Sequence, residues 1–223
     1  MKRYEAVIFD WDGTVMDSTH SITTAIQLAS GDLGLPVPST AIASWVIGLS
    51  LESALYRAVP ELTAEQMPLF LERYRHHFFQ RDPHIKLFDG ILDFMTELKN
   101  QDVILAVATG KSREGLTRTL GNVHLSDFFT ATRCADETQS KPHPQMLYEL
   151  LDELSLDASD VLMIGDTTHD IYMAETAGLD SVAVTYGAHD PDTLHKAKPT
   201  YMVHQVPELR ELVLGLVKRP LVS

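Results

Sequence analysis

The stretch Val7-Ile8-Phe9-Asp10-Trp11-Asp12-Gly13-Thr14 sets two acids, a glycine and a hydroxyl directly behind a short apolar run. The run is typical of a buried strand. Because strand side chains alternate between two sides, Asp10 and Asp12 leave it aimed at the same side before Gly13 lets the backbone bend away. The pattern predicts a strand that ends in an active site, although an ordinary strand with an aspartate-glycine turn would produce the same local sequence.

Crowding Asp10 and Asp12 into one small volume has a chemical consequence. Two like charges this close stay ionised together only when a cation is bound, and otherwise one acid keeps its proton. Either state is useful to an enzyme, so the rest of the chain has to decide between an active site and a plain turn.

The composition is that of a globular protein with room for one good-sized core and a smaller second module. The chain has 223 residues, a mass of 24.9 kDa and 44% hydrophobic residues. Its formal net charge of -13 and its pI near 5.1 argue against non-specific binding to nucleic acid or to an anionic membrane, because the long-range field repels both. An anionic substrate would therefore need a local cationic pocket.

The first residues and the cysteine content bear on the compartment. The basic start Met1-Lys2-Arg3-Tyr4 leads into an apolar run that Asp10 stops. The run is too short for the core of a signal peptide or for a bilayer span, so we expect a cytoplasmic protein. The single cysteine, Cys134, excludes an intrachain disulfide framework and a cysteine zinc site, and we expect it to be structural.

The chain after the first strand divides into two regions with different patterns of predicted secondary structure. Helical patterns follow one another from about residue 16 to 85, and the longest has Met67, Phe70, Leu71, Tyr74 and Phe78 on one face. From about residue 86 helical patterns alternate with apolar strands, which we expect at 103–108, 128–132, 161–165 and 181–185. Such alternation indicates a parallel sheet with helices on both faces.

We therefore predict an α/β fold with a Rossmann-like, doubly wound parallel sheet as its core. Residues 1–15 and 86–223 are expected to form this catalytic core, and residues 16–85 an inserted α-helical cap. The chain shows no repeats, low-complexity tracts or long linkers.

Polar groups gather where the predicted strands end. They are Asp10 and Asp12, Thr109 and Gly110, and Asp166 and Asp170, with Lys141 in a loop between the last two pairs. In open parallel sheets ligands bind beyond the carboxyl ends of the strands. Carboxylates form an oxygen-rich cage suited to Mg²⁺, a hydroxyl and backbone amides suit phosphate oxygens, and a lysine offsets phosphate charge. Each group alone could belong to a turn or a helix cap, but together they predict a magnesium and phosphate site.

The same residues, in the same order, resemble the signature motifs of the haloacid dehalogenase superfamily. The matching stretches are Asp10-Trp11-Asp12-Gly13-Thr14, Thr109, Lys141 and Gly165-Asp166-Thr167-Thr168-His169-Asp170. The helical insert is similar to the α-helical cap of the phosphoglycolate-phosphatase-like branch. The resemblance implies a Mg²⁺-dependent phosphatase that hydrolyses a small phosphorylated metabolite, either phosphoglycolate-like or a sugar phosphate. We expect a monomer or homodimer.

The resemblance also implies roles for individual residues. Asp10 would attack phosphorus and become an aspartyl phosphate, while Asp12, kept protonated in the crowded site, would donate to the leaving oxygen and then deprotonate water. Mg²⁺ would be held by the Asp10 carboxylate, the Asp12 backbone carbonyl and the Asp166 carboxylate. Asp170 would bind it through water or orient the direct ligands. The phosphoryl group would be held by Thr109, Gly110, Lys141 and the backbone amides of Trp11 and Asp12.

Other functions remain open at this stage. A phosphomutase of the β-phosphoglucomutase type shares all four motifs and differs in whether a sugar phosphate or water meets the aspartyl phosphate. Gly165-Asp166 favours the phosphatase by family resemblance. A phospho-acceptor signalling receiver also clusters aspartates, a hydroxyl and a lysine around Mg²⁺, but it needs neither an acid two residues after its acceptor nor a large helical cap.

Substrate choice is expected to lie in the insert, because the strand-end motifs recognise only phosphate and metal. Gly48 interrupts a helical pattern between apolar residues. This suits a loop with Gly48, Leu49 and Ser50 dipping toward the strand ends, on an insert that swings about linkers near Val15 and Lys86. A glycine that merely ends a helix would give the same pattern.

Overall fold

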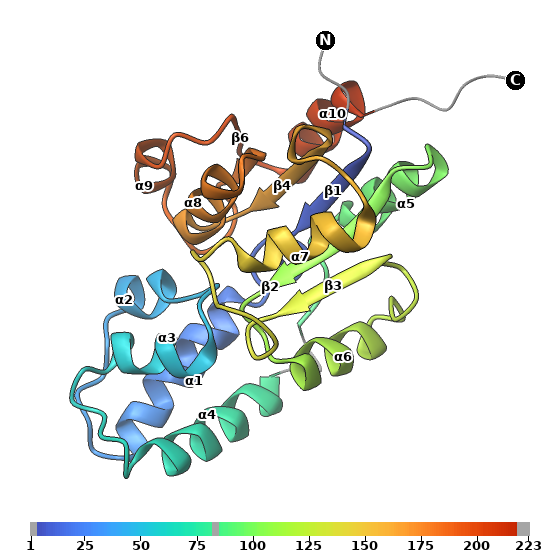
Figure 1. Ribbon diagram of the computed structural model, residues 1–223. Coiled ribbons are helices and arrows are strands. Elements are labelled where there is room, and N and C mark those ends of the chain that lie inside the picture. The colour runs from blue at the N-terminus through green and yellow to red at the C-terminus, as the bar shows by residue number, and fades with distance from the viewer. Residues whose placement is uncertain (1–3, 82–84, 218–223) are drawn as a thin grey trace, which may run out of the picture.

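The centre of the molecule is a six-stranded sheet in the computed structural model, which describes residues 4–81 and 85–217. All neighbouring strands are parallel, in the order β3-β2-β1-β4-β5-β6 (Figure 1). The strands are β1 (Ala6–Phe9), β2 (Ile104–Thr109), β3 (Ala131–Cys134), β4 (Val161–Gly165), β5 (Asp180–Val184) and β6 (Tyr201–Val203). The predicted doubly wound α/β fold is confirmed.

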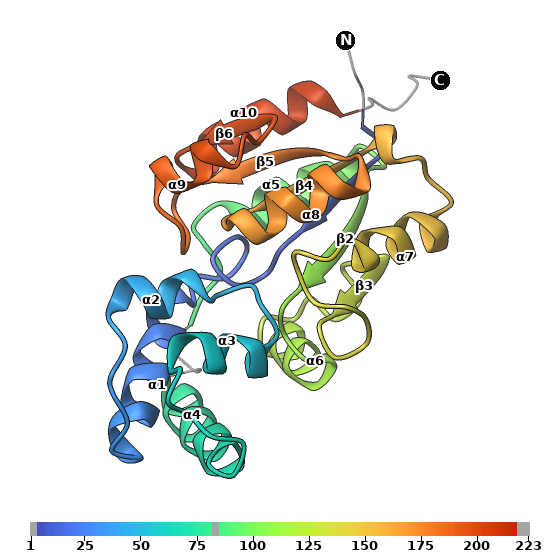
Figure 2. The same ribbon diagram turned by 60° about the vertical axis from the view of Figure 1, so that its left-hand side comes forward.

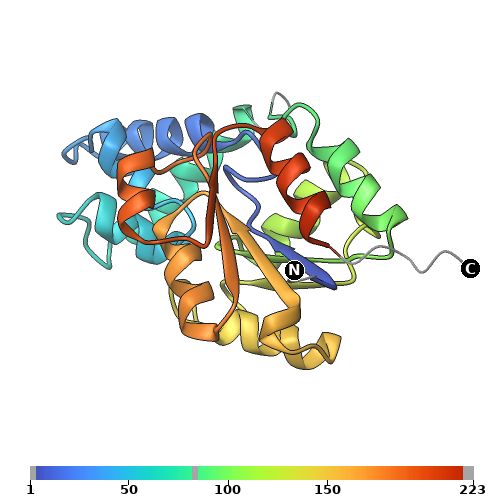
Figure 3. The same ribbon diagram turned by 90° about the horizontal axis from the view of Figure 1, so that it is seen from above.

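The side chains of β1 are apolar on both faces of the sheet, which explains why helices cover both sides. Val7 and Phe9 belong to a core cluster on one face, and Ala6 and Ile8 to a cluster on the other. The first face packs against α5 (Ile91–Asn100), α6 (Arg113–Asn122) and α10 (Val206–Leu216). The second packs against α7 (Gln145–Leu154) and α8 (Thr168–Ala177). Figure 3 shows α5 and α10, green and red, on the opposite side of the sheet from α7 and α8, yellow and orange.

A separate group of four helices, called the helical unit below, lies beyond the carboxyl ends of the strands (Figure 2). It comprises α1 (Thr19–Asp32), α2 (Thr40–Trp45), α3 (Leu51–Ala58) and α4 (Met67–Arg81). These helices share a hydrophobic cluster of their own, around Ile26, Leu55 and Phe70. An independent apolar core is what an inserted module needs to hold its shape.

The two connections of the helical unit run side by side. Met16 and Leu87 form an antiparallel bridge, the Asp17 amide donates to the Lys86 carbonyl at 2.9 Å, and the Phe88 amide donates to the Val15 carbonyl at 3.1 Å. The chain thus leaves the sheet and returns to it at one place. The division into a core of residues 1–15 and 86–223 and an insert of 16–85 stays a prediction.

Local signals account for the helix ends of the insert. The Ser39 side chain accepts from the Ile42 amide at the start of α2. Thr63 and Gln66 bond reciprocally in the turn before α4, at 3.1 and 3.3 Å. Because α4 begins at Met67, Pro68 lies in its first turn. A backbone N–H at that position would have no partner within the helix, so proline is tolerated there.

Three elements in the second half of the chain differ from the prediction. The strand predicted at 128–132 instead begins at Ala131, because Phe128 and Phe129 are apolar loop residues that pack against the core. The short elements α9 (Pro191–Lys196) and β6 were not predicted, because three to six residues are too few to show a helical or strand periodicity.

None of the helices within 4–81 and 85–217 combines the length and apolar content that a bilayer span requires.

Candidate active site

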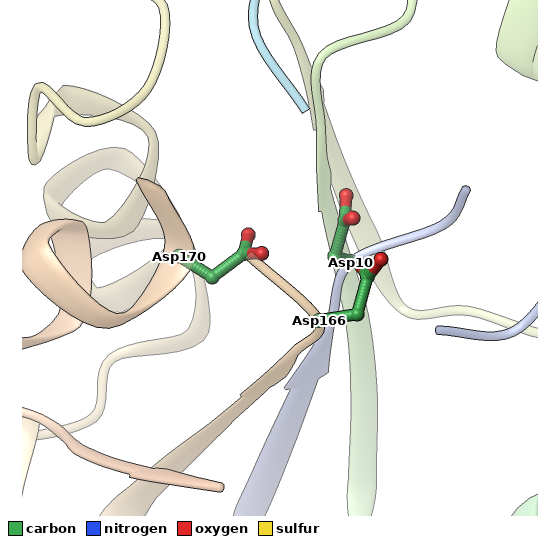
Figure 4. Close-up of side chains that lie close together, drawn as sticks. All are labelled: Asp10, Asp166 and Asp170. Atoms are coloured by element: carbon green, nitrogen blue, oxygen red, sulfur yellow. The ribbon is translucent and has the colours of Figure 1, made fainter. Parts of the chain in front are cut away.

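Three buried acids meet at the carboxyl end of the sheet. Asp10 follows β1, Asp166 follows the neighbouring strand β4, and Asp170 lies in the first turn of α8. Each offers an oxygen within 4.8 Å of the others. Figure 4 shows the three side chains close together, with Asp170 reaching from α8 toward Asp10 and Asp166. The sheet order therefore explains the cluster, because β1 and β4 are adjacent and parallel.

Lys141 lies against the three acids. Its Nζ donates to Asp10 Oδ1 at 2.7 Å and to Asp170 Oδ1 at 2.6 Å. Burial works against the charge of this ammonium, but the two carboxylates outweigh burial and raise the pKa of Lys141 above its ordinary range. The loop lysine predicted to meet the strand ends does so.

Backbone amides and threonine hydroxyls donate to both oxygens of Asp166 and to the second oxygen of Asp170. Asp166 accepts from the Thr14 hydroxyl at 2.9 Å and from the Ala188 amide at 2.6 Å. Asp170 Oδ2 accepts from the amide and hydroxyl of Thr167, which closes the capping box at the start of α8. Both carboxylates are thereby oriented toward the centre of the cluster. The contribution of Thr14 was not predicted, although it stands at the end of the first motif.

Asp10 retains an oxygen with no protein partner. Oδ2 is buried and accepts no hydrogen bond among the described residues. Burial raises the pKa of Asp10 to about 7 against the attraction of Lys141, and the charge of Asp170 adds to the increase. Burial and the neighbouring charges of Asp10 and Asp170 likewise hold the pKa of Asp166 well above its ordinary range. A divalent cation fits this site, because its donors are all oxygens and the ion would supply positive charge that three buried acids beside one lysine lack.

Asp12 lies outside the three-acid cluster. Its Oδ1 accepts from the Ser18 hydroxyl at 2.6 Å, and its Oδ2 pairs with Lys111 Nζ at 2.9 Å. Donors therefore occupy both carboxyl oxygens of Asp12. Neither partner was predicted. Ser18 directly precedes α1, and its side chain makes no cap bond there.

The helical unit closely approaches the core at the end of β2. Thr109 is buried, and its Oγ1 accepts from the Lys111 amide at 3.2 Å. A Cβ on Gly110 would lie 2.5 Å from the carbonyl oxygens of both Gly48 and Leu49. Only glycine admits this approach. The loop predicted to dip toward the strand ends does lie there.

Other contacts fix the same loop. Gly48 has a φ of +92°, and a Cβ on it would lie 3.3 Å from Thr167 Oγ1. The Ser50 amide donates to Ser140 Oγ at 2.9 Å. Gly48, Leu49 and Ser50 are therefore all within reach of the core segments that carry the acids and Lys141.

Two histidines of the core bind the backbone just before this loop. The Nε2 atoms of His169 and His189 lie 3.0 and 2.9 Å from the Trp45 carbonyl. Burial lowers the pKa of His169 to about 4, so the ring is neutral near pH 7 and serves as a hydrogen-bond donor. The structure thus places His169 beneath the helical unit.

Trp11, between the two acids of the first motif, is completely buried and packs edge-on against Phe129 with ring centres 6.0 Å apart. Its carbonyl accepts from the amides of Thr14, Val15 and Met16, which closes the turn that follows Asp12.

Cys134 is buried, and burial raises the pKa of its thiol to about 12. The thiol therefore stays protonated near neutral pH, in line with a structural role.

Comparisons with known proteins agree with this geometry. The family model described as haloacid dehalogenase-like hydrolase matches residues 7–184. A Dickeya dadantii protein named "Probable phosphatase IndB" is 33% identical, with 95% of this chain and 94% of that protein covered. A Pectobacterium atrosepticum protein named "Phosphoglycolate phosphatase" is 30% identical, with 92% and 90% covered. The crystal structure of a predicted phosphatase from Clostridium acetobutylicum has a TM-score of 0.84 and 27% identity, and the match covers 96% of this chain and all of that one (100%).

The close approach at Gly110 gives a test of the contact between the helical unit and the core. In a Gly110→Ala variant the new Cβ must push the loop at residues 46–50 away, because backbone atoms occupy its place. Amide hydrogen exchange in that loop should quicken by about tenfold or more, the effect of roughly 1–3 kcal/mol of overpacking. Gly121→Ala in α6 is the control, since nothing lies within 4 Å of its Cβ. Equal exchange in the Gly110 variant and the native protein would contradict the contact.

Proposed function

Because the chain belongs to the haloacid dehalogenase-like hydrolases, we propose that it is a Mg²⁺-dependent phosphatase that hydrolyses a small phosphomonoester through an aspartyl-phosphate intermediate. The observation that carries the proposal is the buried, unpartnered Oδ2 of Asp10, beside an Oδ1 that Lys141 holds at 2.7 Å. One oxygen is anchored and the other is available, as a carboxylate nucleophile requires. The relatives named as phosphatases support transfer of a phosphoryl group to water.

The residues that would hold Mg²⁺ are the Asp10 and Asp166 carboxylates and the Asp12 backbone carbonyl, with Asp170 beside them. When bound, the ion would neutralise charge on the phosphoryl oxygens and on the acids. Asp170 already bonds Lys141 and Thr167 through its two oxygens, which supports an orienting role for it.

In the first step a carboxylate oxygen of Asp10 forms a bond to phosphorus as the bond to the leaving oxygen breaks. A proton from Asp12 goes to that leaving oxygen. In the second step Asp12 takes a proton from water, water attacks phosphorus, and phosphate leaves with Asp10 restored. Because Ser18 and Lys111 occupy both oxygens of Asp12, at least one of these contacts would open before Asp12 delivers a proton.

Phosphoryl oxygens would be bound by Thr109, Lys141 and the backbone amides of Trp11, Asp12 and Gly110. The burial of Thr109 and Lys141 supports this, because donors in a water-excluded site act strongly on charge that grows during transfer. Substrate choice would fall to Gly48, Leu49 and Ser50, which lie over the strand ends and can contact the leaving group. A phosphoglycolate-like compound or a sugar phosphate would suit a site enclosed in this way.

The first test is the nucleophile. Asp10→Asn should lower turnover of an aryl phosphate by at least about a thousandfold, because the covalent step is lost. Phosphate release with Mg²⁺ present measures it. Asp93→Asn, an exposed aspartate of α5, is the matched control and should keep native activity. If Asp10→Asn keeps more than about a tenth of the native rate, Asp10 is not the nucleophile.

Asp12 has a separable role. Asp12→Asn should slow hydrolysis of the phosphoenzyme by about a hundredfold or more, the usual contribution of a general acid-base. Mg²⁺ affinity should change less, because the proposed ligand from this residue is its backbone carbonyl. Rapid-quench mass spectrometry and Mg²⁺ titration measure the two effects, with Asp17→Asn, exposed in the same segment, as control. Weaker Mg²⁺ binding with unchanged chemistry would contradict the role.

A further inference from the structure

We propose that Lys111 determines substrate specificity by binding a second anionic group, a carboxylate or phosphate, on the leaving group of the phosphomonoester. This inference rests on the proposed function. It assigns a role to a cation outside the residues that the motifs place around the phosphoryl group.

Lys111 lies on the leaving-group side of the site. Its Nζ is 2.9 Å from Asp12 Oδ2, and Asp12 is the residue that would protonate the leaving oxygen. Whatever substituent follows that oxygen must therefore pass close to the Lys111 ammonium. An ammonium has three N–H donors, so Lys111 can contact Asp12 and a substrate oxygen together.

The two lysines of the site differ in access. The Lys141 side chain is 0% exposed, and its Nζ is shared between Asp10 and Asp170. The Lys111 side chain is 13% exposed, so a small molecule can reach it. Lys141 is thus enclosed with the acids at the phosphoryl site, whereas Lys111 can be reached by the rest of a substrate.

Lys111 also lies where the helical unit meets the core. Its Nζ is 5.4 Å from the ring centre of Phe78 in α4, and the guanidinium of Arg118 is 5.9 Å from the same ring. Tyr74 stacks on Phe78, and burial together with the Asp12 charge raises the pKa of its hydroxyl above the ordinary range. Two cations and a phenol therefore gather around one aromatic ring beside Asp12, in a chain whose formal net charge is -13. Such a corner favours an anionic substituent over a neutral one.

A matched pair of substrates isolates the second anion. 2-Phosphoglycolate carries a carboxylate where 2-hydroxyethyl phosphate carries a neutral alcohol, and the two have the same chain length. The native protein should prefer 2-phosphoglycolate in kcat/KM. In Lys111→Met the ratio of the two kcat/KM values should fall by about 10- to 100-fold, the worth of one charge-assisted hydrogen bond, mainly through KM for 2-phosphoglycolate.

Two further variants complete the test. Lys111→Arg keeps the charge and should recover most of the lost ratio, and Lys196→Met removes an exposed lysine of α9 and should leave the ratio unchanged. An equal fall on both substrates, or an unchanged ratio, would overturn the role of Lys111 while turnover of 2-hydroxyethyl phosphate shows that the variant is folded. If the native protein hydrolyses neither substrate with Mg²⁺ present, the proposed function itself fails.

Discussion

The repulsion among buried carboxylates at one end of the sheet is the constraint on which the rest of the site depends. Asp10, Asp166 and Asp170 offer oxygens within 4.8 Å of one another, and all three are buried. At such distances and in a low dielectric, like charges repel by several kcal/mol unless positive charge lies among them. One lysine, Lys141, contacts two of these acids, so the cluster is stable in its ionised form only with further positive charge.

Several features of the fold hold these acids close together despite their repulsion. Asp166 and Asp170 are held by donors that cannot turn away, among them the Ala188 amide and the Thr167 cap. A Cβ on Gly165 or on Gly187 would overlap the Asp170 or the Asp166 side chain, so small residues keep the space. The helical unit lies over the strand ends (Figure 2), where it excludes water and strengthens each electrostatic contact beneath it. The charges that destabilise the site are thus the ones that a phosphatase could use.

The central strands and the acids that follow them could be predicted from sequence for a simple reason. β1 and β4 are continuous apolar runs, and the acid after each run must lie at the edge where parallel strands end. Gly178, with a φ of +79°, closes α8 at the position where glycine commonly ends a helix. By contrast, Phe128 and Phe129 read as a strand because apolar residues signal burial, and burial in a loop gives the same pattern. The three-residue β6 is too short to show alternation.

Several specific contacts between distant segments could not be predicted from the sequence. The Asp12 carboxylate pairs with Ser18 and Lys111, and these contacts arise from the way β1, α1 and the end of β2 meet. The bonds from His169 and His189 to the Trp45 carbonyl depend likewise on how the helical unit sits on the core. No local pattern encodes such a relation, because each partner alone looks like an ordinary surface or cap residue.

The most direct test of the central claim is calorimetric titration of the protein with Mg²⁺, without substrate. We expect one ion to bind per chain, and Asp166→Asn to weaken its binding by about tenfold or more while Asp152→Asn, exposed on α7, has no effect. Equal Mg²⁺ affinity in the native protein and in Asp166→Asn, or no Mg²⁺ binding to the native protein, would contradict the account.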